Sequence, residues 1–338
     1  MPDDRLVIRN PILPGFNPDP SICRAGDDYY IATSTFEWFP GVQIHHSRDL
    51  VHWRLHSRAL TRTSQLDMRG NPRLCGIWAP CLTLHDGLFH LVYTDVKTMM
   101  LGPMGDHPNY LVTTRDISEG WSEPIFLNAS GFDPSLFHDD DGRKWLVNML
   151  SDYRPDRPGM NGIVLQEYDP EAKRLVGPTT RVFGGTELGG TEGPHLYRRD
   201  GWYYLLTAEG GTSFGHAVTL ARSREITGPY EVMPGNPVLT ARDNPHLPLQ
   251  KSGHADLVET QDGEWYMVHL ASRPLPSRGR CVLGRETCIQ RVEWDAEGWL
   301  RVAGGGREPR LEVPAPVLPA HPWDDGYAIQ RTRPAPNA

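Results

Sequence analysis

Short runs of aromatic and aliphatic residues recur along the chain, and each run follows a turn built on aspartate. The runs are Tyr29-Tyr30-Ile31-Ala32, Phe89-His90-Leu91-Val92, Trp145-Leu146-Val147, Tyr203-Tyr204-Leu205-Leu206 and Trp265-Tyr266-Met267-Val268. The turns before them are Asp27-Asp28, Asp86-Gly87, Asp141-Gly142, Asp200-Gly201 and Asp262-Gly263. Aspartate followed by glycine between such runs is a strong β-hairpin signal. The pattern therefore predicts repeated antiparallel hairpins and no long amphipathic helix.

A second motif, x-Pro-x-aliphatic, precedes each hairpin. It occurs as Asp19-Pro20-Ser21-Ile22, Ala79-Pro80-Cys81-Leu82, Asp133-Pro134-Ser135-Leu136 and Gly193-Pro194-His195-Leu196, and without proline as Ala255-Asp256-Leu257-Val258. Successive motifs are 60, 54, 60 and 62 residues apart. Five regular units of short strands predict an all-β, five-bladed β-propeller with four-stranded blades. A pair of β-sandwiches is the competing architecture.

The composition changes near the C-terminus, which suggests a domain boundary. Gly304-Gly305-Gly306 is followed by seven prolines between Pro309 and Pro336. Such a stretch cannot form a central strand. We therefore expect a propeller over residues 1–303 and, over residues 304–338, a Pro/Gly-rich C-terminal tail that wraps the propeller or a linker.

Equivalent positions of a propeller repeat converge on its axis, and here they carry chemistry. They hold Asp19, Trp78 with Ala79, Asp133, Glu192 and His254. Aspartate before proline often only caps a turn. Three carboxylates in one register are harder to explain that way, because clustered like charges cost energy. An inverting glycosidase needs a protonated carboxylic acid and an ionised carboxylate base on opposite sides of the sugar, and a third carboxylate can raise the pKa of the acid.

Other residue types complete the candidate pocket. Phe36, Trp38, Phe39 and Trp78 are expected in loops near its mouth, where aromatic rings bind the apolar face of a pyranose. Arg285 is a candidate for recognising sugar hydroxyls or balancing charge. The histidines show no HExxH spacing, so a catalytic zinc is not indicated. His254 could ligate a cation in the channel or simply accept a hydrogen bond.

Charge and cysteine content narrow the partners and the compartment. The formal net charge is −8 and no block of Lys or Arg stands out, which argues against nucleic acid or an anionic membrane and suits a neutral carbohydrate. No run of 18 apolar residues predicts a membrane span. The N-terminus lacks a secretory pattern, and the five cysteines form no CxxC pair, so we expect free thiols and a cytoplasmic location.

Several of these motifs together resemble glycoside hydrolase family 43, in its β-xylosidase and α-L-arabinofuranosidase branch. They are Asn17-Pro18-Asp19-Pro20-Ser21-Ile22, Ser34-Thr35-Phe36-Glu37-Trp38-Phe39-Pro40-Gly41-Val42, Trp78-Ala79-Pro80, Phe132-Asp133-Pro134-Ser135-Leu136-Phe137, Thr191-Glu192-Gly193-Pro194-His195 and Leu205-Leu206-Thr207-Ala208-Glu209-Gly210-Gly211. The resemblance covers residues 10–302 and implies a five-bladed propeller and inversion at the anomeric carbon. Many relatives also carry a C-terminal β-sandwich that is not present in this chain.

The resemblance also implies roles for individual residues. Asp19 would be the general base, Glu192 the general acid and Asp133 the group that modulates the pKa of the acid. Phe36, Trp78, Thr207 and Arg285 would shape the pocket. His254 would correspond to a channel histidine that ligates calcium or another divalent ion in some relatives, although the chemistry itself requires no cofactor.

The sequence thus predicts an inverting exo-glycosidase that removes terminal β-D-xylosyl units from xylo-oligosaccharides. It could also, or instead, remove α-L-arabinofuranosyl units from arabinan or arabinoxylan fragments. A sugar-binding propeller without catalysis is the alternative from another class. A homo-oligomer is one option that the sequence leaves open.

Overall fold

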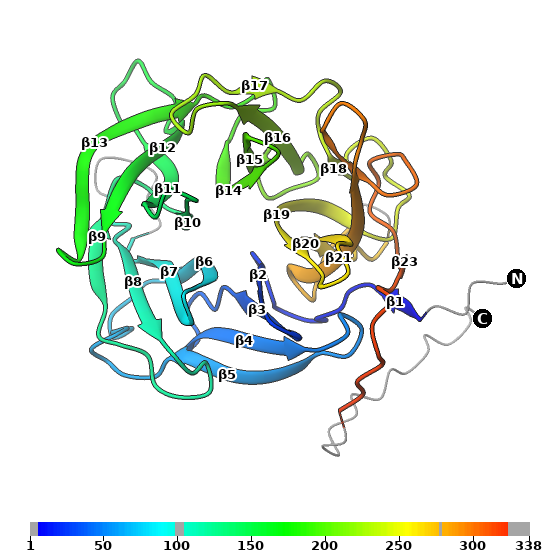
Figure 1. Ribbon diagram of the computed structural model, residues 1–338, viewed down its shortest axis with the longest axis horizontal. Helices are drawn as coiled ribbons and strands as arrows, with labels where there is room; N and C mark the ends of the chain where they lie inside the picture. Colours follow the sequence, from blue (N-terminus) through cyan, green and yellow to red (C-terminus); the bar gives the residue numbers. More distant parts are fainter. Residues whose placement is uncertain (1–5, 99–104, 277–278, 324–338) are drawn as a thin grey trace, which may run out of the picture.

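Five antiparallel sheets surround a central axis in the computed structural model, which describes residues 6–98, 105–276 and 279–323 (Figure 1). In blade 1 the strands from the axis outward are β2 (Ser21–Ala25), β3 (Asp28–Thr33), β4 (Gly41–Ser47) and β5 (Arg54–Leu60). Blade 2 comprises β6 (Gly76–His85), β7 (Leu88–Val96), β8 (Asn109–Thr114) and β9 (Ile125–Asn128). Blade 3 comprises β10 (Ser135–His138), β11 (Lys144–Ser151), β12 (Met160–Asp169) and β13 (Arg174–Phe183).

The remaining two blades follow the same plan. Blade 4 comprises β14 (Glu192–Arg199), β15 (Trp202–Glu209), β16 (Ala217–Ser223) and β17 (Glu231–Val232), with β18 (Leu239–Thr240) also pairing with β16. Blade 5 comprises β19 (Gln250–Glu259), β20 (Trp265–Ser272), β21 (Glu286–Trp294) and β22 (Leu300–Val302). The predicted all-β, five-bladed propeller is confirmed.

The aspartate-containing turns join the first and second strand of each blade. Asp86-Gly87 and Asp200-Gly201 have two successive residues with positive φ, at 51° and 67° and at 50° and 73°. This is the backbone of a type I′ turn, whose twist matches that of the strands it joins. The turn chemistry read from the sequence therefore explains these two hairpins directly.

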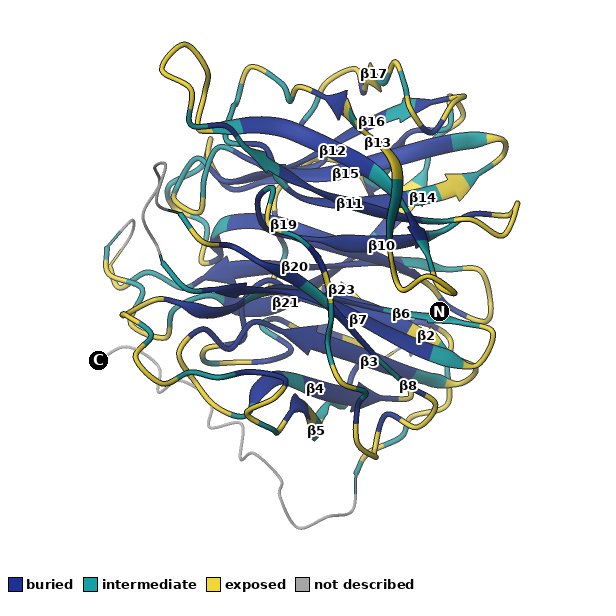
Figure 2. Ribbon diagram, turned by 90° about the vertical axis from the view of Figure 1, so that its left-hand side faces the viewer, coloured by how far each residue is buried: buried dark blue, intermediate teal, exposed yellow. Residues whose placement is uncertain are grey.

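The hydrophobic core is divided among the gaps between blades. Each pair of neighbouring blades shares one cluster of buried side chains, and the second and third strands of each blade are buried along most of their length, whereas outer strands such as β13 are not (Figure 2). Blade 2, for example, contributes Leu82 and Leu91 to the cluster that it shares with blade 1, and Leu111 to the cluster that it shares with Leu146 of blade 3. Because every blade is packed on both faces, the inner strands are held rigidly around the axis.

Segments from the two ends of the described chain seal the gap between blades 5 and 1. Strand β1 (Val7–Arg9) pairs antiparallel with β23 (Glu312–Pro314), beside these blades in Figure 1. Ile8 and Val313 from this ribbon are buried in one cluster with Tyr29 of blade 1 and Tyr266 of blade 5. Part of the stretch expected as a tail thus forms an edge strand, while residues 324–338 lie outside the described residues.

Beyond β23 the chain continues onto the outer part of blade 1. The backbone N–H of His321 donates to Asp49 Oδ2 at 2.7 Å, and Trp323 Nε1 donates to the His52 carbonyl at 3.2 Å. The Arg54 guanidinium lies 3.8 Å from the centre of the Trp323 ring. Up to residue 323, these contacts hold the C-terminal stretch against the outer part of blade 1.

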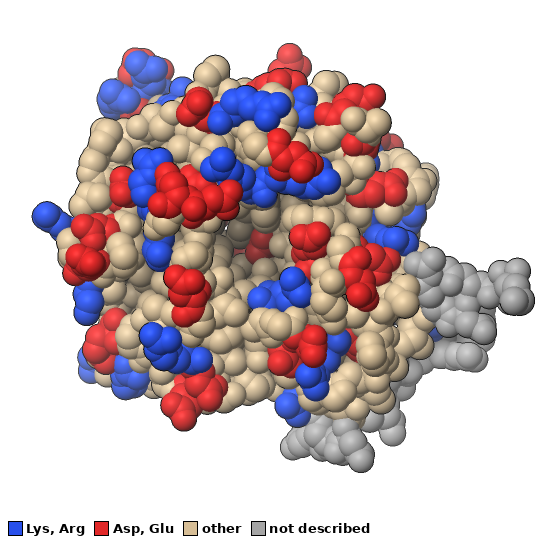
Figure 3. Space-filling view, viewed as in Figure 1, with Lys and Arg blue, Asp and Glu red and all other residues tan. Residues whose placement is uncertain are grey.

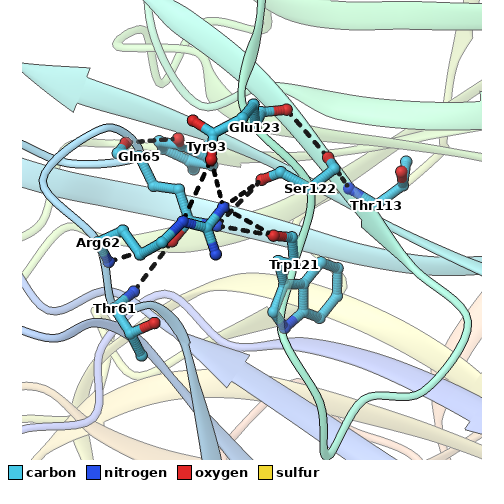
Figure 4. Close-up of polar contacts among 8 residues, drawn as sticks. All are labelled: Thr61, Arg62, Gln65, Tyr93, Thr113, Trp121, Ser122 and Glu123. Carbon is cyan, nitrogen blue, oxygen red and sulfur yellow. Dashed lines mark hydrogen bonds and ion pairs between the residues drawn. The ribbon is translucent and has the colours of Figure 1, made fainter.

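Blades 1 and 2 are also joined at their periphery. Arg62 Nη2 donates to the Trp121 carbonyl at 3.0 Å and pairs with Glu123 Oε1 at 2.7 Å, and Gln65 Nε2 donates to the same Trp121 carbonyl at 3.1 Å (Figure 4). The Tyr93 hydroxyl donates to the Gln65 carbonyl at 2.9 Å. This network fixes the segment that leads from β5 toward β6.

The part of the chain that the structure describes contains no helix with the length and hydrophobicity of a membrane span.

Asn10 links the N-terminal segment to blade 5 and to the C-terminal stretch, so its loss should weaken closure. Its side chain is buried, donates to the carbonyls of Ile289 and Arg310 at 2.7 and 2.9 Å, and accepts from the Ile289 N–H at 2.8 Å. Asn10→Ala leaves these backbone groups unpaired and should cost about 2–4 kcal/mol of unfolding free energy. Chemical denaturation measures the loss.

The neighbouring Arg9→Ala variant is the control. Its exposed side chain makes a 3.6 Å ion pair with Glu312, which is expected to contribute less than about 0.5 kcal/mol. Equal stability of the two variants would contradict the assigned role of Asn10.

Candidate active site

The candidate site is built on five equivalent residues that share a left-handed backbone. Asp19, Ala79, Asp133, Gly193 and His254 have φ of 52°, 36°, 55°, 53° and 48°. They line a narrow cavity on the axis together with the prolines that follow four of them. Left-handed backbone at residues other than glycine is strained, and such strain concentrates at functional sites. The fifth equivalent residue is His254, so the repeat in blade 5 is offset by one from the expected Ala255.

Asp19 is buried and held by two donors. Arg285 Nη1 lies 2.9 Å from its Oδ1, and the Ser34 hydroxyl donates to its Oδ2 at 2.7 Å. Burial by itself would raise the pKa of Asp19, but the guanidinium of Arg285, together with His254 and Ser34, lowers it below the ordinary value. The carboxyl group is therefore ionised at neutral pH.

Asp133 and Glu192 have the opposite character. Burial, with the negative charges of Glu192 and Asp19, raises the pKa of Asp133 well above its ordinary value. Burial and the charge of Asp19 raise the pKa of Glu192 to about 7, although Arg285 acts against this. Asp133 Oδ2 accepts the N–H of Gly193 at 3.1 Å, directly beside Glu192. The site thus combines an ionised carboxylate with two carboxyl groups that hold a proton more tightly than an ordinary carboxyl group.

His254 stands between two of the carboxyl groups. Its Nδ1 lies 3.9 Å from Asp19 Oδ1 and 3.9 Å from Asp133 Oδ2. Burial lowers the pKa of His254 to about 4, so its imidazole is neutral at pH 7. A Cβ on Gly193 would lie 3.0 Å from the His254 ring. The glycine in the Glu192-Gly193-Pro194 motif therefore gives this imidazole its space.

The described residues do not form a closed protein cage for a metal ion. No group of three or more His, Cys, Asp or Glu side chains within residues 6–98, 105–276 and 279–323 is placed to hold one. Around His254, the Asp19 carboxylate is already paired with Arg285. A divalent cation at this position would have to compete with that guanidinium for the carboxylate.

Aromatic side chains form a wall beside the carboxyl groups. We call Phe36, Trp78, His107 and Phe132 the aromatic wall; the Trp78 ring lies 5.6, 6.3 and 5.5 Å from the other three rings. Trp78 is in strand β6, not in a loop as expected, and its Nε1 donates to the Leu74 carbonyl at 2.8 Å. The guanidinium of Arg285 lies 4.8 Å from the centre of the Phe36 ring. Trp38 and Phe39 are exposed.

Thr207 is placed differently from the other candidates. It is buried within β15, and its hydroxyl is hydrogen-bonded to the Thr219 hydroxyl at 2.7 Å. The structure therefore brings together Asp19, Asp133, Glu192, Arg285, His254 and the aromatic wall. It places Thr207 on the strand that pairs with Glu192, with its hydroxyl turned to Thr219.

Sequence reasoning gave no role to several residues that shape the site. Ser34 bridges Asp19 and the backbone N–H of Ala79, the latter at 2.7 Å. His107 and Phe132 complete the aromatic wall. Ser34 and Phe132 lie within motifs that carry the family resemblance, but the sequence does not show which residues a hydroxyl or an aromatic ring will contact in the fold. His107 lies far from every axial motif in sequence.

Below the carboxyl groups the axis widens into a second cavity of about 350 Å³. Its lining includes His195, Tyr197 and Asp256, and His195 also borders the axial cavity above. Tyr197 donates its hydroxyl proton to Asp256 Oδ1 at 2.6 Å, and the Ser21 hydroxyl donates to Asp256 Oδ2 at 2.8 Å. Viewed down the axis, the molecule is hollowed at its centre, and acidic and basic groups are interspersed on the visible face (Figure 3).

Buried carboxyl groups of opposite protonation on the axis of a five-bladed propeller provide the acid and the base that a glycoside hydrolase uses. Residues 8–300 match the family model described as Glycosyl hydrolases family 43. The chain belongs to this family.

Two curated proteins and one solved structure illustrate the relationship. The chain is 64% identical over 299 residues to Xylosidase/arabinosidase 43B of Humicola insolens, which covers 88% of this chain and 55% of that protein. It is 58% identical over 330 residues to a beta-xylosidase of Bacillus subtilis (strain 168), covering 95% and 61%. The crystal structure of xylan beta-1,4-xylosidase from Bacillus halodurans C-125 superposes with a TM-score of 0.92 at 62% identity, covering 94% and 60%. The chain thus spans less than two thirds of the length of each.

Removing the charge of Arg285 should change the titration of two carboxyl groups. Its guanidinium lowers the pKa of both Asp19 and Glu192, so Arg285→Gln is expected to raise both values. Carbon-13 NMR of the side-chain carboxyls measures this, with Glu192→Gln used to assign the signal near pH 7. Arg273→Gln is the matched control, because Arg273 pairs with Glu286 at 2.7 Å. Unchanged titrations in Arg285→Gln would refute the electrostatic assignment.

Proposed function

We propose that the chain is the catalytic propeller of an exo-acting, inverting glycosidase that removes terminal β-D-xylosyl units from xylo-oligosaccharides. The observation that carries the proposal is the division of protonation on the axis: Asp19 has a lowered pKa, and Glu192 has a pKa raised to about 7. Opposite shifts of two carboxyl groups in one site identify a base and an acid.

In this mechanism Asp19 activates water. The water oxygen attacks the anomeric carbon and its proton passes to the Asp19 carboxylate, while the glycosidic C–O bond breaks on the other side of the sugar. Glu192 gives its proton to the departing oxygen. The attack from the opposite face inverts the configuration, so a β-xyloside yields α-xylose and a xylo-oligosaccharide that is one unit shorter.

The supporting residues keep the two acids in these states. Arg285 holds Asp19 ionised, and Ser34 orients its second oxygen. Asp133 Oδ2 accepts the N–H of Gly193, which places its carboxyl group beside the residue that follows Glu192. The aromatic wall offers the apolar surface against which a pyranose ring packs.

The names of the relatives support both sugars. The two proteins reported above carry the names beta-xylosidase and xylosidase/arabinosidase. Removal of terminal α-L-arabinofuranosyl units is therefore the second candidate activity. A non-catalytic sugar-binding propeller would need no carboxyl groups of opposite protonation, so the geometry favours an enzyme.

Compartment, assembly and cation stay predictions. The described cysteines form no disulfide, which supports action in the reducing cytoplasm. The chemistry as proposed needs no metal, because Arg285 already supplies positive charge beside Asp19. Calcium at His254, and a homo-oligomer, are left for direct measurement.

Replacing either acid tests the activity. Asp19→Asn and Glu192→Gln are each expected to lower kcat on xylobiose by about 10²–10⁴-fold with the fold intact, since each removes one proton transfer. Hydrolysis of xylobiose, 4-nitrophenyl β-D-xylopyranoside and 4-nitrophenyl α-L-arabinofuranoside measures the effect and ranks the two sugars. Circular dichroism checks folding. Near-normal turnover of xylobiose by either variant, or no turnover by the unaltered protein, would reject the proposal.

The same protonation states set the pH dependence. Glu192 must carry a proton, so kcat/KM should fall as pH rises through about 7. Asp19 must be ionised. Because its pKa is lowered from the ordinary value of 3.8, the loss of activity caused by protonation of Asp19 should occur only below pH 3.8. Initial rates from pH 4 to 9 test this. A rate that stays constant from pH 6 to 9 would be incompatible with Glu192 as the acid.

A further inference from the structure

Glu209, at the end of β15, is a fully buried carboxyl group that the mechanism above does not use. Its oxygens accept the backbone N–H of Thr186 at 3.0 and 3.2 Å and also the Thr186 hydroxyl. Burial raises the pKa of Glu209, and the hydroxyls of Thr191 and Thr219 lie close enough to its carboxyl group to act against that rise, as Thr186 does. Burying a carboxyl group costs free energy unless several donors bond to it. Such a hydrogen-bond network restricts the positions of the residues that supply the donors.

The donors connect both ends of one loop. We call residues 184–191 the acid loop, because it leads directly into Glu192, the first residue of β14. Thr186 lies near its start and Thr191 at its end. A Cβ on Gly185 would lie 2.0 Å from the Thr191 hydroxyl oxygen, so the two ends are packed tightly against each other. The Gly210 N–H, next to Glu209, also donates to the Gly189 carbonyl in the middle of the loop at 2.7 Å.

Regular strand pairing around Glu192 is interrupted, although the N–H of Gly193 is held by Asp133 at 3.1 Å. Glu192 pairs with Ala208, but the register then shifts before His195 pairs with Leu206. On its other side, the acid loop contains Gly185, Gly189 and Gly190 in left-handed backbone, the conformation that glycine adopts at high entropic cost. Orientation of Glu192 therefore depends on what anchors the loop.

Thr207 belongs to the same cluster. Its hydroxyl bonds to the Thr219 hydroxyl, which in turn reaches Glu209. The sequence motif Thr207-Ala208-Glu209 thus places a hydroxyl and a carboxyl group on β15, on either side of Ala208, the residue that pairs with Glu192 of β14.

We propose that Glu209 is a positioning residue for the general acid: by holding Thr186 and Thr191 together it fixes the acid loop and aims Glu192 at the departing oxygen. The inference rests on the proposed function of Glu192. Misplacement of a catalytic group by about 1 Å can cost about 100-fold in rate.

The test compares two leaving groups. Glu209→Gln keeps the size of the side chain but places an N–H₂ group among donors. It should lower kcat on xylobiose by about 10–100-fold with KM changed less than about threefold. On 2,4-dinitrophenyl β-D-xylopyranoside, whose leaving group departs without a proton, the loss should stay below about threefold. The variant should be a milder copy of Glu192→Gln, which depends on the leaving group in the same way.

Controls separate positioning from stability. Asp139→Asn changes another buried carboxyl group, which accepts from Tyr203 and Arg198 at 2.8 and 2.9 Å, and should show no dependence on the leaving group. Thr186→Val removes one hydroxyl from Glu209 and decides the matter if Glu209→Gln does not fold.

The outcomes distinguish the two proposals. Equal losses on both substrates, or no loss on either, in a folded Glu209→Gln or Thr186→Val variant would overturn the positioning role. If the unaltered protein hydrolyses neither substrate, the proposed function itself fails. Selective loss on xylobiose supports both.

Discussion

The ion pair between Arg285 and Asp19 determines how the rest of the site behaves. Three carboxyl groups are brought to one axis, where burial disfavours the charged form of each. The guanidinium contacts Asp19 at 2.9 Å and holds it ionised. That negative charge then helps keep protons on Asp133 and Glu192. A single contact therefore sorts chemically similar groups into a base and its protonated partners.

Packing in the propeller offsets the cost in stability of the strained backbone that carries these groups. Asp19, Ala79, Asp133 and His254 have left-handed backbone, which costs stability at residues with a side chain beyond hydrogen. Interblade clusters hold each inner strand on both faces, and the β1–β23 ribbon seals the last gap. Local strain on the axis is thereby offset by packing far from it. Hydrogen-bonded supports, Ser34 behind Asp19 and Glu209 behind the acid loop, then set the orientation of individual carboxyl groups.

Much of the architecture could be read from the repeat. The aspartate turns and aromatic runs predicted the hairpins, and the x-Pro motifs placed Asp19, Asp133 and Glu192 on one axis. The sequence motif did not reveal that His254, and not Ala255, is the equivalent residue of blade 5, because this blade lacks the proline that marks the register in the other four. Trp78 was expected in a loop, yet it is the third residue of the inner strand β6, since a pattern of residue types does not show where strand pairing starts. Thr207 was assigned to the pocket by resemblance, but its hydroxyl turns to Thr219.

The sequence by itself determined the number of blades, the strands and the residue types at the axis, because hydrophobic periodicity and turn chemistry are local properties that repeat. Only the tertiary structure decided which carboxyl group is ionised, which aromatic rings face the site and what lies behind the acid. These depend on contacts between residues far apart in sequence, such as Arg285 with Asp19 and Thr186 with Glu209. Burial and distance control such contacts, and both exist only once the five blades have closed.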